Sequence, residues 1–120
     1  TKVRVVRKKS GLEEALIDFA ALRRDVERAS VGGGKAYNMI FNIHLDTLNM
    51  IDVSVMVATS ALQRDETRGA HTREDFPEQR DDYGLFNTFL RRGGDGLPVT
   101  EKRDVVFKHK SLEACRNHKK

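Results

Sequence analysis

The densest set of chemically capable side chains in this 120-residue sequence lies just after its midpoint. Arg68, His71 and Arg73 supply several hydrogen-bond donors in one short run, and Glu74 and Asp75 supply acceptors directly after them. Guanidinium groups pair bidentately with carboxylates and other anions. The run therefore suits a staple that fastens a helix end to another surface, or a site for an anionic ligand. We favour the staple, because charged clusters are more often structural than functional.

Two small residues separate these donors. Gly69 tolerates the left-handed backbone conformation that ends many helices, and Ala70 leaves room for a facing backbone. The sequence therefore predicts that a long helix ends at Gly69 and that the three donors project from its end. The alternative to docking is local pairing with Asp65, Glu74 and Asp75, which contributes roughly 0–1 kcal/mol when the pair is exposed.

A glycine-rich run, Gly32-Gly33-Gly34-Lys35-Ala36, has some features of a phosphate-binding loop. Ala29 stands where such a loop needs its first glycine, and Ala36 lacks the hydroxyl that would bind magnesium. The run therefore predicts a turn between two helices.

The histidines and the single cysteine do not form a recognisable site. His44, His71, His109 and His118 include no pair at helical ligand spacing, and Cys115 has no second cysteine to pair with. We therefore predict no catalytic, metal-binding or cofactor-binding residue in this chain.

These side chains must be positioned by a small domain with an aliphatic core, because 38% of residues are hydrophobic, 7% are aromatic and none is Trp. Ser10-Gly11-Leu12-Glu13 fits a capping box and predicts the start of a first helix. Leu12, Leu16 and Phe19 recur at helical spacing on one face. The glycines at 32–34 are expected to end this helix.

A second helix is predicted from about Lys35 to Arg68. Its apolar stretch carries Asp46, Asp52 and several amides, a polar load that favours a helix buried in a water-soluble protein over a membrane span. It has two apolar stripes, of which the shorter first helix can cover one. A further helix, a second domain or a partner must then cover the other. The first stripe is Phe41, Leu45, Leu48, Ile51, Val55, Ala58 and Leu62, and the second is Ile43, Met50, Val53, Val57 and Ala61.

Beyond Gly69 the helical periodicity stops. The segment 70–84 is polar and irregular, and Leu85–Arg92 and Leu97–Phe107 flank a Gly-Gly-Asp-Gly turn that predicts a hairpin. A frayed tail, Lys108–Lys120, follows. The predicted fold is mainly α: an up-and-down, spectrin-repeat-like bundle of long helices in 1–69, then an irregular extension with a small C-terminal β-hairpin and basic tail in 70–120.

One run of residues is more specific than the elements around it. It consists of Ala61-Leu62, Arg64, Glu66-Thr67-Arg68-Gly69-Ala70-His71-Thr72-Arg73-Glu74-Asp75-Phe76-Pro77-Glu78 and Asp81-Asp82. Together with a Leu-Glu-Glu-Ala-Leu helix start, a Tyr-Asn pair before the long helix and a late Gly-Asp-Gly turn, this run resembles the flavoprotein subunits of succinate dehydrogenase and fumarate reductase, and the resemblance spans about residues 5–106. The last 40 residues depart from the family: Leu85 and Thr88 stand where it usually has Trp and His, and Arg103-Asp104-Val105 where it usually has Lys-Pro-Val.

The resemblance implies a C-terminal helical domain whose bundle has its first helix outside this chain. It further implies that the full subunit binds FAD, interconverts succinate and fumarate, and passes electrons to an iron–sulfur subunit. The Gly-x-Gly-x-x-Gly motif of a dinucleotide-binding fold is absent here. The chain would therefore support the FAD-binding domain, with Arg68, His71 and Arg73 docking the two. The subunit would lie on the cytoplasmic face of the membrane, or on the matrix side in mitochondria, and would contact the membrane only through partner subunits.

The net charge of +4 is placed unevenly, with basic ends and an acidic middle. A free-standing basic helical module that binds nucleic acid or an acidic partner is therefore an alternative, as is an oligomerisation domain whose second stripe pairs with its own copy. We favour solvated basic ends and no nucleic-acid binding, because a nucleic-acid binder more often carries its charge along one folded face.

Overall fold

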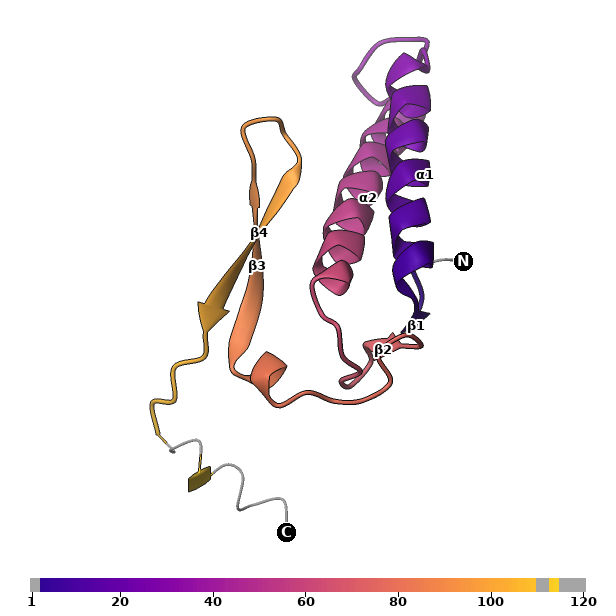
Figure 1. Cartoon of the computed structure of the whole chain (residues 1–120). Helices are drawn as coiled ribbons and strands as arrows, with labels where there is room; N and C mark the ends of the chain where they lie inside the picture. Colours follow the sequence, from indigo (N-terminus) through magenta and orange to yellow (C-terminus); the bar gives the residue numbers. More distant parts are fainter. Residues whose placement is uncertain (1–2, 110–112, 115–120) are drawn as a thin grey trace.

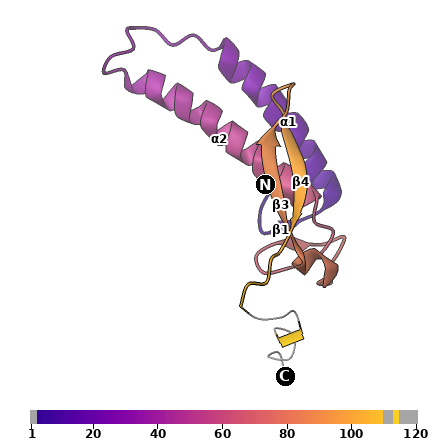
Figure 2. The same cartoon turned by 90° about the vertical axis from the view of Figure 1, so that its left-hand side faces the viewer.

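The computed structural model describes residues 3–109 and 113–114. Two antiparallel helices, α1 (Lys9–Arg28) and α2 (Met39–Leu62), lie side by side, and a hairpin stands beside α2 (Figure 1). The view turned by 90° shows the long connection between the far ends of the two helices (Figure 2). A mainly helical fold with a C-terminal hairpin is thus confirmed. Cys115 and His118, with most of the tail predicted to fray, lie outside the described residues.

The helices share a small aliphatic core near one end. Leu12 of α1 and Ala58 of α2 are fully buried, and Ala61 is nearly so. Val3, Leu16, Phe19 and Leu62 pack around these three residues. The predicted contact between the face of the first helix and the long helix is therefore confirmed.

The two stripes of α2 differ as predicted. In the first stripe, Ile51 and Ala58 are buried and Leu45 alone is exposed. In the second, every residue except Ala61 is exposed, with Met50 61% exposed. The helix is therefore not covered on most of its surface by this chain, contrary to the expectation of a buried helix. By length and composition alone, α2 is also apolar enough to cross a membrane.

The start of α1 differs from the prediction. The helix begins at Lys9, with Lys8 as its N-cap residue, and the side chain of Lys8 makes no capping hydrogen bond. Ser10 lies inside the first turn, so the predicted capping box is wrong. Instead, the Lys9 amide donates to Oδ2 of Asp75 at 2.9 Å. The sequence did not reveal this cap, because its acceptor lies far along the chain.

Helix α2 is shorter at both ends than the predicted span from Lys35 to Arg68. It begins after Asn38, whose side-chain oxygen accepts from the Phe41 amide at 3.1 Å. It ends at Leu62, and its last carbonyl groups include acceptors for a distant arginine described below. Gly69 does adopt the left-handed conformation, with φ of 56°, but it does so in a turn well past the helix end.

Two short strands join the chain start to the segment after α2. β1 (Val6–Arg7) pairs in parallel with β2 (Thr72–Arg73). The Thr72 amide donates to the Val5 carbonyl at 3.1 Å, and the Glu74 amide donates to the Arg7 carbonyl at 2.8 Å. This pairing crosses residue 69, where the sequence suggested a division of the chain, and that division stays a prediction.

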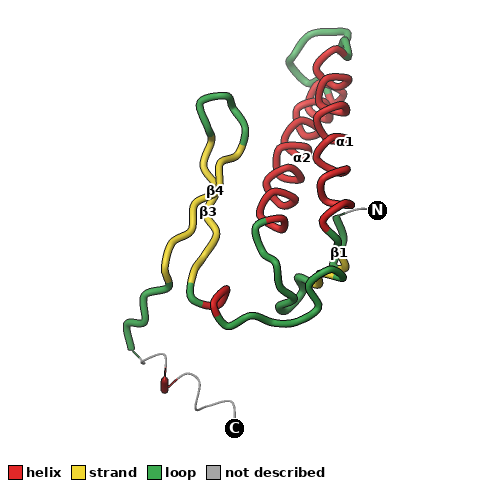
Figure 3. Tube along the Cα trace, in the orientation of Figure 1, coloured by secondary structure: helices red, strands yellow, loops and turns green. Residues whose placement is uncertain are grey.

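The hairpin is formed as predicted. After a single 3-10 turn, η1 (Asp82–Gly84), strands β3 (Phe86–Arg92) and β4 (Pro98–Asp104) pair antiparallel (Figure 3). The four-residue turn closes through Gly93, whose amide donates to the Leu97 carbonyl at 2.8 Å. Both strands contact α2, so the hairpin forms a second layer over that helix.

Candidate functional site

The predicted cluster lies in the segment 63–84, hereafter the arginine-rich segment, which connects α2 to the hairpin. Its central side chain is Arg73, which is completely buried. Arg73 donates twice to Asp75, with both nitrogen–oxygen distances at 2.7 Å. Its remaining nitrogen donates to the carbonyl oxygens of Ala61 at 3.2 Å and Arg64 at 3.1 Å, at the end of α2. Arg73 therefore caps a helix C-terminus, where a cation is favoured.

Asp75 extends the same contact to the other helix. Its carboxylate accepts from Arg73 and from the Lys9 amide, at the N-terminus of α1 where an anion is favoured. The hydrogen bond from Arg73 holds the pKa of Asp75 well below its usual range and raises the pKa of Arg73. The pair of the buried Arg73 and the partly exposed Asp75 thus connects the positive end of α1 to the negative end of α2.

Glu66 is the second buried charge of the segment, and its side chain is fully enclosed. Its carboxylate accepts from the guanidinium groups of Arg64 and Arg68, and from the Arg80 amide at 3.0 Å. Burial opposes ionisation of Glu66, but the hydrogen bonds from Arg68 and Arg64 outweigh it and lower the pKa. Arg68 also donates to the Arg80 carbonyl at 2.7 Å, which closes the segment around Glu66.

Aromatic rings connect this network to the hairpin. Tyr83 is buried, and its ring centroid lies 5.2 Å from that of Phe86 in β3. The cationic groups of Arg64, Arg80 and Lys102 lie over the Tyr83 ring at 4.8–5.7 Å. Such contacts favour cations over the faces of aromatic rings, so the network fixes the base of the hairpin as well as the helix ends.

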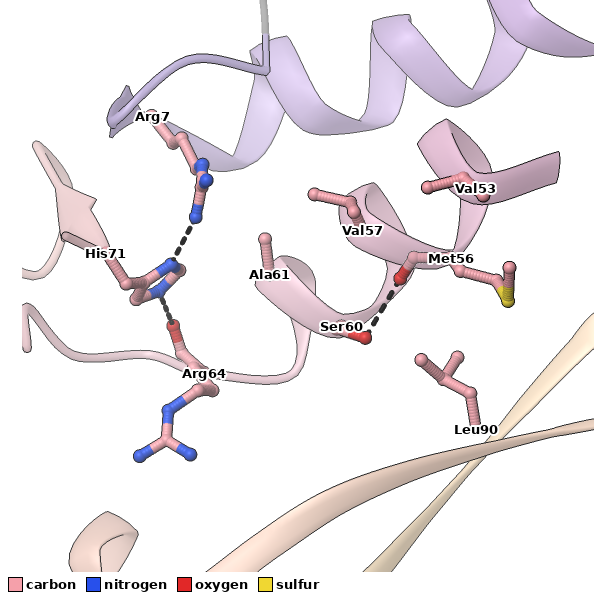
Figure 4. A pocket seen from close by; sticks show the side chains of 9 residues that line it. All are labelled: Arg7, Val53, Met56, Val57, Ser60, Ala61, Arg64, His71 and Leu90. Carbon is pink, nitrogen blue, oxygen red and sulfur yellow. Dashed lines mark hydrogen bonds between the residues drawn. The ribbon is translucent and has the colours of Figure 1, made fainter. Parts of the chain in front are cut away.

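His71 joins the segment to β1. Its Nδ1 lies 2.7 Å from a guanidinium nitrogen of Arg7, and its Nε2 lies 3.1 Å from the Arg64 carbonyl oxygen (Figure 4). The guanidinium can only donate, so Nδ1 accepts and Nε2 carries the proton. Burial lowers the pKa of His71, and the nearby charges of Arg7, Arg73 and Arg64 act in the same direction.

An open hollow of about 320 Å³ lies beside this histidine, between α2 and the hairpin. Figure 4 shows an apolar wall from α2, with Leu90 of β3 on the opposite side and the polar groups gathered at one end. The residues that line it are Arg7, Val53, Met56, Val57, Ser60, Ala61, Arg64, His71 and Leu90.

The three predicted site residues lie in one segment and make local contacts. Arg73 pairs with Asp75 and lies 3.5 Å from Asp65, so the local pairing considered as the alternative exists for this residue. Arg68 and His71 remain partly exposed. The sequence reasoning missed Arg7 and Glu66. The one signal for Glu66 was its place in the specific run, and Arg7 was read as part of a solvated basic end.

The site offers no arrangement for flavin or metal chemistry. Within the described residues, each sheet has two strands, and the parallel pair β1–β2 has only two residues in each strand, so it does not form the parallel sheet of a dinucleotide-binding fold. In the same part of the chain, no group of three or more His, Cys, Asp or Glu side chains is placed to hold a metal ion. The arrangement is suited to fixing the geometry of the backbone around the helix ends.

Comparison with known proteins identifies the family to which this chain belongs. Residues 1–117 match the sequence profile of the family described as "Fumarate reductase flavoprotein C-term". The chain belongs to this family. As a fumarate reductase flavoprotein C-terminal domain, it is 38% identical over 87 residues to a fumarate reductase flavoprotein subunit of Mycobacterium tuberculosis. That match covers 64% of this chain and 15% of the relative.

Solved structures agree with the sequence comparison. The flavoprotein C-terminal domain superimposes on a chain of Mycobacterium smegmatis Sdh1 in complex with UQ1 with a TM-score of 0.82 and 30% identity, covering 93% of this chain and 20% of that chain. A chain of E. coli quinol fumarate reductase gives a TM-score of 0.71 at 25% identity, covering 89% and 19%. The domain thus spans about a fifth of these chains. None of these findings supports the alternative of a free-standing basic module.

Proposed function

We propose that this domain braces the FAD-binding domain of a flavoprotein subunit that interconverts succinate and fumarate. The single observation that carries the proposal is the match of residues 1–117 to the flavoprotein C-terminal family. The names of the relatives, which include fumarate reductase and succinate dehydrogenase flavoprotein subunits, support the same reaction. FAD, when bound elsewhere in the subunit, would supply the redox chemistry. The residues described here would supply only position and stability.

The exposed stripe of α2 supports a further part of this proposal. Met50 and Val53 are each more than half exposed, although Ile51 between them is buried against the rest of the chain. Apolar area left in water forgoes about 25 cal/mol per Å². A helix from elsewhere in the subunit, packed on this stripe, would complete a spectrin-repeat-like bundle and recover that free energy.

The docking role of Arg68, His71 and Arg73 is also part of the proposal. Arg73 is buried among contacts within this chain, so it would act indirectly by holding the arginine-rich segment in one shape. Arg68 keeps one third of its side chain exposed, and it would meet carbonyl or carboxylate groups of the FAD-binding domain directly. Charge-assisted contacts of this kind contribute about 1.5–3 kcal/mol each when they are desolvated.

The assembled enzyme would pass electrons to an iron–sulfur subunit. Sdh1 in complex with UQ1 and the E. coli quinol fumarate reductase are the similar structures that support this placement. We propose that the subunit lies on the cytoplasmic face of the membrane, or on the matrix side in mitochondria. In this arrangement α2 would contact protein, and the membrane would be reached only through partner subunits.

The test uses the intact polypeptide that contains this chain, loaded with FAD. Succinate should reduce an artificial electron acceptor, or fumarate should oxidise a reduced one, and the 120-residue chain alone should do neither. A flavin-loaded polypeptide that acts on neither acid would contradict the proposal. So would stoichiometric, tight binding of FAD by the 120-residue chain, because the flavin site would then lie within it.

The docking role has its own test in the same preparation. Arg68→Ala should speed the loss of FAD during dialysis and leave the KM for succinate unchanged. The matched control is Arg103→Ala on the hairpin, where the side chain pairs with the exposed Glu101 and lies over the Phe89 ring, and flavin retention should not change. A raised KM with normal flavin retention would contradict docking, because Arg68 would then act on the substrate.

A further inference from the structure

His71 is held between two elements that are far apart in the sequence. Arg7 belongs to β1, near the start of the chain, and the Arg64 carbonyl lies just past the end of α2. The imidazole touches both, at 2.7 Å and 3.1 Å (Figure 4). One ring therefore spans the gap between the N-terminal segment and the helix end.

Only one protonation state of the ring fits both contacts. Nδ1 must accept from the Arg7 guanidinium, which has no lone pair to offer in return. Nε2 must donate to the Arg64 carbonyl. A second proton on Nδ1 would replace the acceptor by a donor, so the contact with Arg7 would become a repulsion between two cations.

We propose that His71 is a pH switch that ties the N-terminal segment, residues 3–8, to the arginine-rich segment when neutral and releases it when protonated. This inference concerns the domain itself and does not depend on the reaction proposed above. It assigns to His71 a role distinct from docking.

Among the charged groups that face one another around His71, the imidazole of His71 is the one expected to titrate near neutral pH. Arg7 faces it from β1, Arg64 from the stretch after α2, and Arg73 from β2. All three guanidinium groups stay charged between about pH 8 and pH 5. Arg64 is balanced by Glu66, and Arg73 by Asp75 with Asp65 nearby. The hairpin contributes the apolar Leu90 to the same hollow.

The partner carboxylates do not take up protons in this range either. The pKa values of Glu66 and Asp75 lie below their usual values because of their arginine partners. Burial and the three arginines lower the pKa of His71, so the switch acts below the ordinary titration range of histidine, about pH 6.5.

Besides His71, backbone pairing ties the N-terminal segment to the arginine-rich segment. In addition to the pairing of β1 with β2, the Thr72 amide donates to the Val5 carbonyl and the Glu74 amide donates to the Arg7 carbonyl. Val3 packs at the edge of the core. Loss of the Arg7 contact would therefore weaken the pairing of β1 with β2, and the amides of Thr72 and Glu74 report that pairing directly.

The experiment measures hydrogen exchange of these two amides in the intact polypeptide, as protection factors corrected for the intrinsic effect of pH. We expect protection to fall severalfold as the pH is lowered from about 7.5 to about 5, because the lowered pKa of His71 places its protonation below the ordinary histidine range. His71→Gln keeps an acceptor and a donor but cannot titrate, so its protection should be independent of pH. The matched control, His44→Gln on α2, should retain the full dependence.

Nitrogen NMR of the histidine rings gives a second readout that needs no variant. His71 should show the Nε2–H tautomer at neutral pH and titrate below the ordinary histidine range. Protection that is independent of pH in the unaltered protein would overturn the proposal. So would a pH dependence that survives His71→Gln, or a His71 ring protonated on Nδ1 at neutral pH.

Discussion

Buried apolar residues and buried charges occur together at the end of the helix pair where α1 begins and α2 ends, whereas neither is found at the opposite end. Leu12, Ala58 and Ala61 are buried at this near end, beside the buried Glu66 and Arg73. At the far end, no residue between 16 and 50 is buried. Between the two helices, Arg23 of α1 forms an exposed ion pair with Asp52 of α2.

The difference shows how a small chain without Trp can stabilise one end of a helix pair. The near end adds to its few buried aliphatic groups an ion pair that satisfies two helix termini at once. This solution requires a contact partner for each charge, because an unpaired buried charge is costly. The far end has no such network, and the apolar face of α2 remains exposed there.

The largest effect is expected from Arg73→Ala. The substitution leaves the Asp75 carboxylate and the last carbonyl groups of α2 without their donor. Hydrogen bonds to charged groups contribute about 1.5–3 kcal/mol, and the fully buried Arg73 makes such bonds to Asp75 and to the end of α2. Urea denaturation of the chain should therefore show a midpoint far below that of the unaltered chain.

The control for this prediction is Arg103→Ala, which removes a guanidinium from an exposed pair on the hairpin. It should leave the urea midpoint nearly unchanged. Equal effects of the two substitutions would contradict the claim that buried charges stabilise the near end, because the near-end network would then contribute no more than an exposed surface pair.

The second-largest effect is expected from acid, which should lower the stability that the near end contributes. The pKa values of Glu66 and Asp75 are lowered in the folded chain, so the unfolded chain binds protons more readily. Their contribution to stability is then complete above about pH 4.5 and is lost as pH falls through the folded pKa values. The urea midpoint should fall from about pH 5 to about pH 3.

Asp75→Asn removes one of these carboxylates and should reduce that acid-induced fall. If the variant lost as much stability in acid as the unaltered chain, Asp75 would not be the group that responds. The contribution of His71 is complete above about pH 6.5 and is lost as pH falls below that value, before the carboxylates take up protons, because the pKa of His71 is lowered in the folded chain.

A smaller effect is expected from Asn38→Ala at the far end. Asn38 caps α2 through the Phe41 amide, and its side-chain nitrogen donates to the carbonyl groups of Gly32 and Gly34. Loss of an N-cap side chain costs about 1 kcal/mol. Thermal denaturation followed by circular dichroism would measure it. A loss as large as that of Arg73→Ala would mean that the far end is not the weaker one.

The smallest effect is expected from Met50→Ser on the exposed face of α2. Met50 is 61% exposed, and surface substitutions away from special features usually change stability by less than about 0.5 kcal/mol. Isothermal urea denaturation of the chain should show this small change. A loss above about 2 kcal/mol would indicate a buried Met50, and therefore a copy of the chain on this face.

Periodicity and turn chemistry predicted both helices, the covered and uncovered stripes of α2 and the hairpin. These features depend on residues close together in the sequence. The cap of α1 and the end of α2 were wrong, because Asp75 and Arg73 satisfy those termini from a distant segment. A local reading of Ser10 or Gly69 cannot detect such contacts.

The docking role of Arg68, His71 and Arg73 stays a prediction, and most of the contacts that these residues make could not be foreseen from the sequence. Arg68, His71 and Arg73 stood out because three donors lie within six residues, and local pairing with Asp75 was already one of the alternatives. The partners Arg7 and Glu66 depend on which charges the fold brings together. That choice depends on the packing of β1 and α1 against the segment, which no local pattern records.

Hydrogen exchange along α2 tests the central claim most directly, namely that this chain stabilises the near end itself and leaves the exposed face to the rest of the subunit. It should be measured in the 120-residue chain and in the intact polypeptide. We expect residues 51–62 to be protected in both, and residues 39–50 to become strongly protected only in the intact polypeptide. Equal, weak protection of residues 39–50 in both would contradict the account, because nothing would then cover the exposed face of α2.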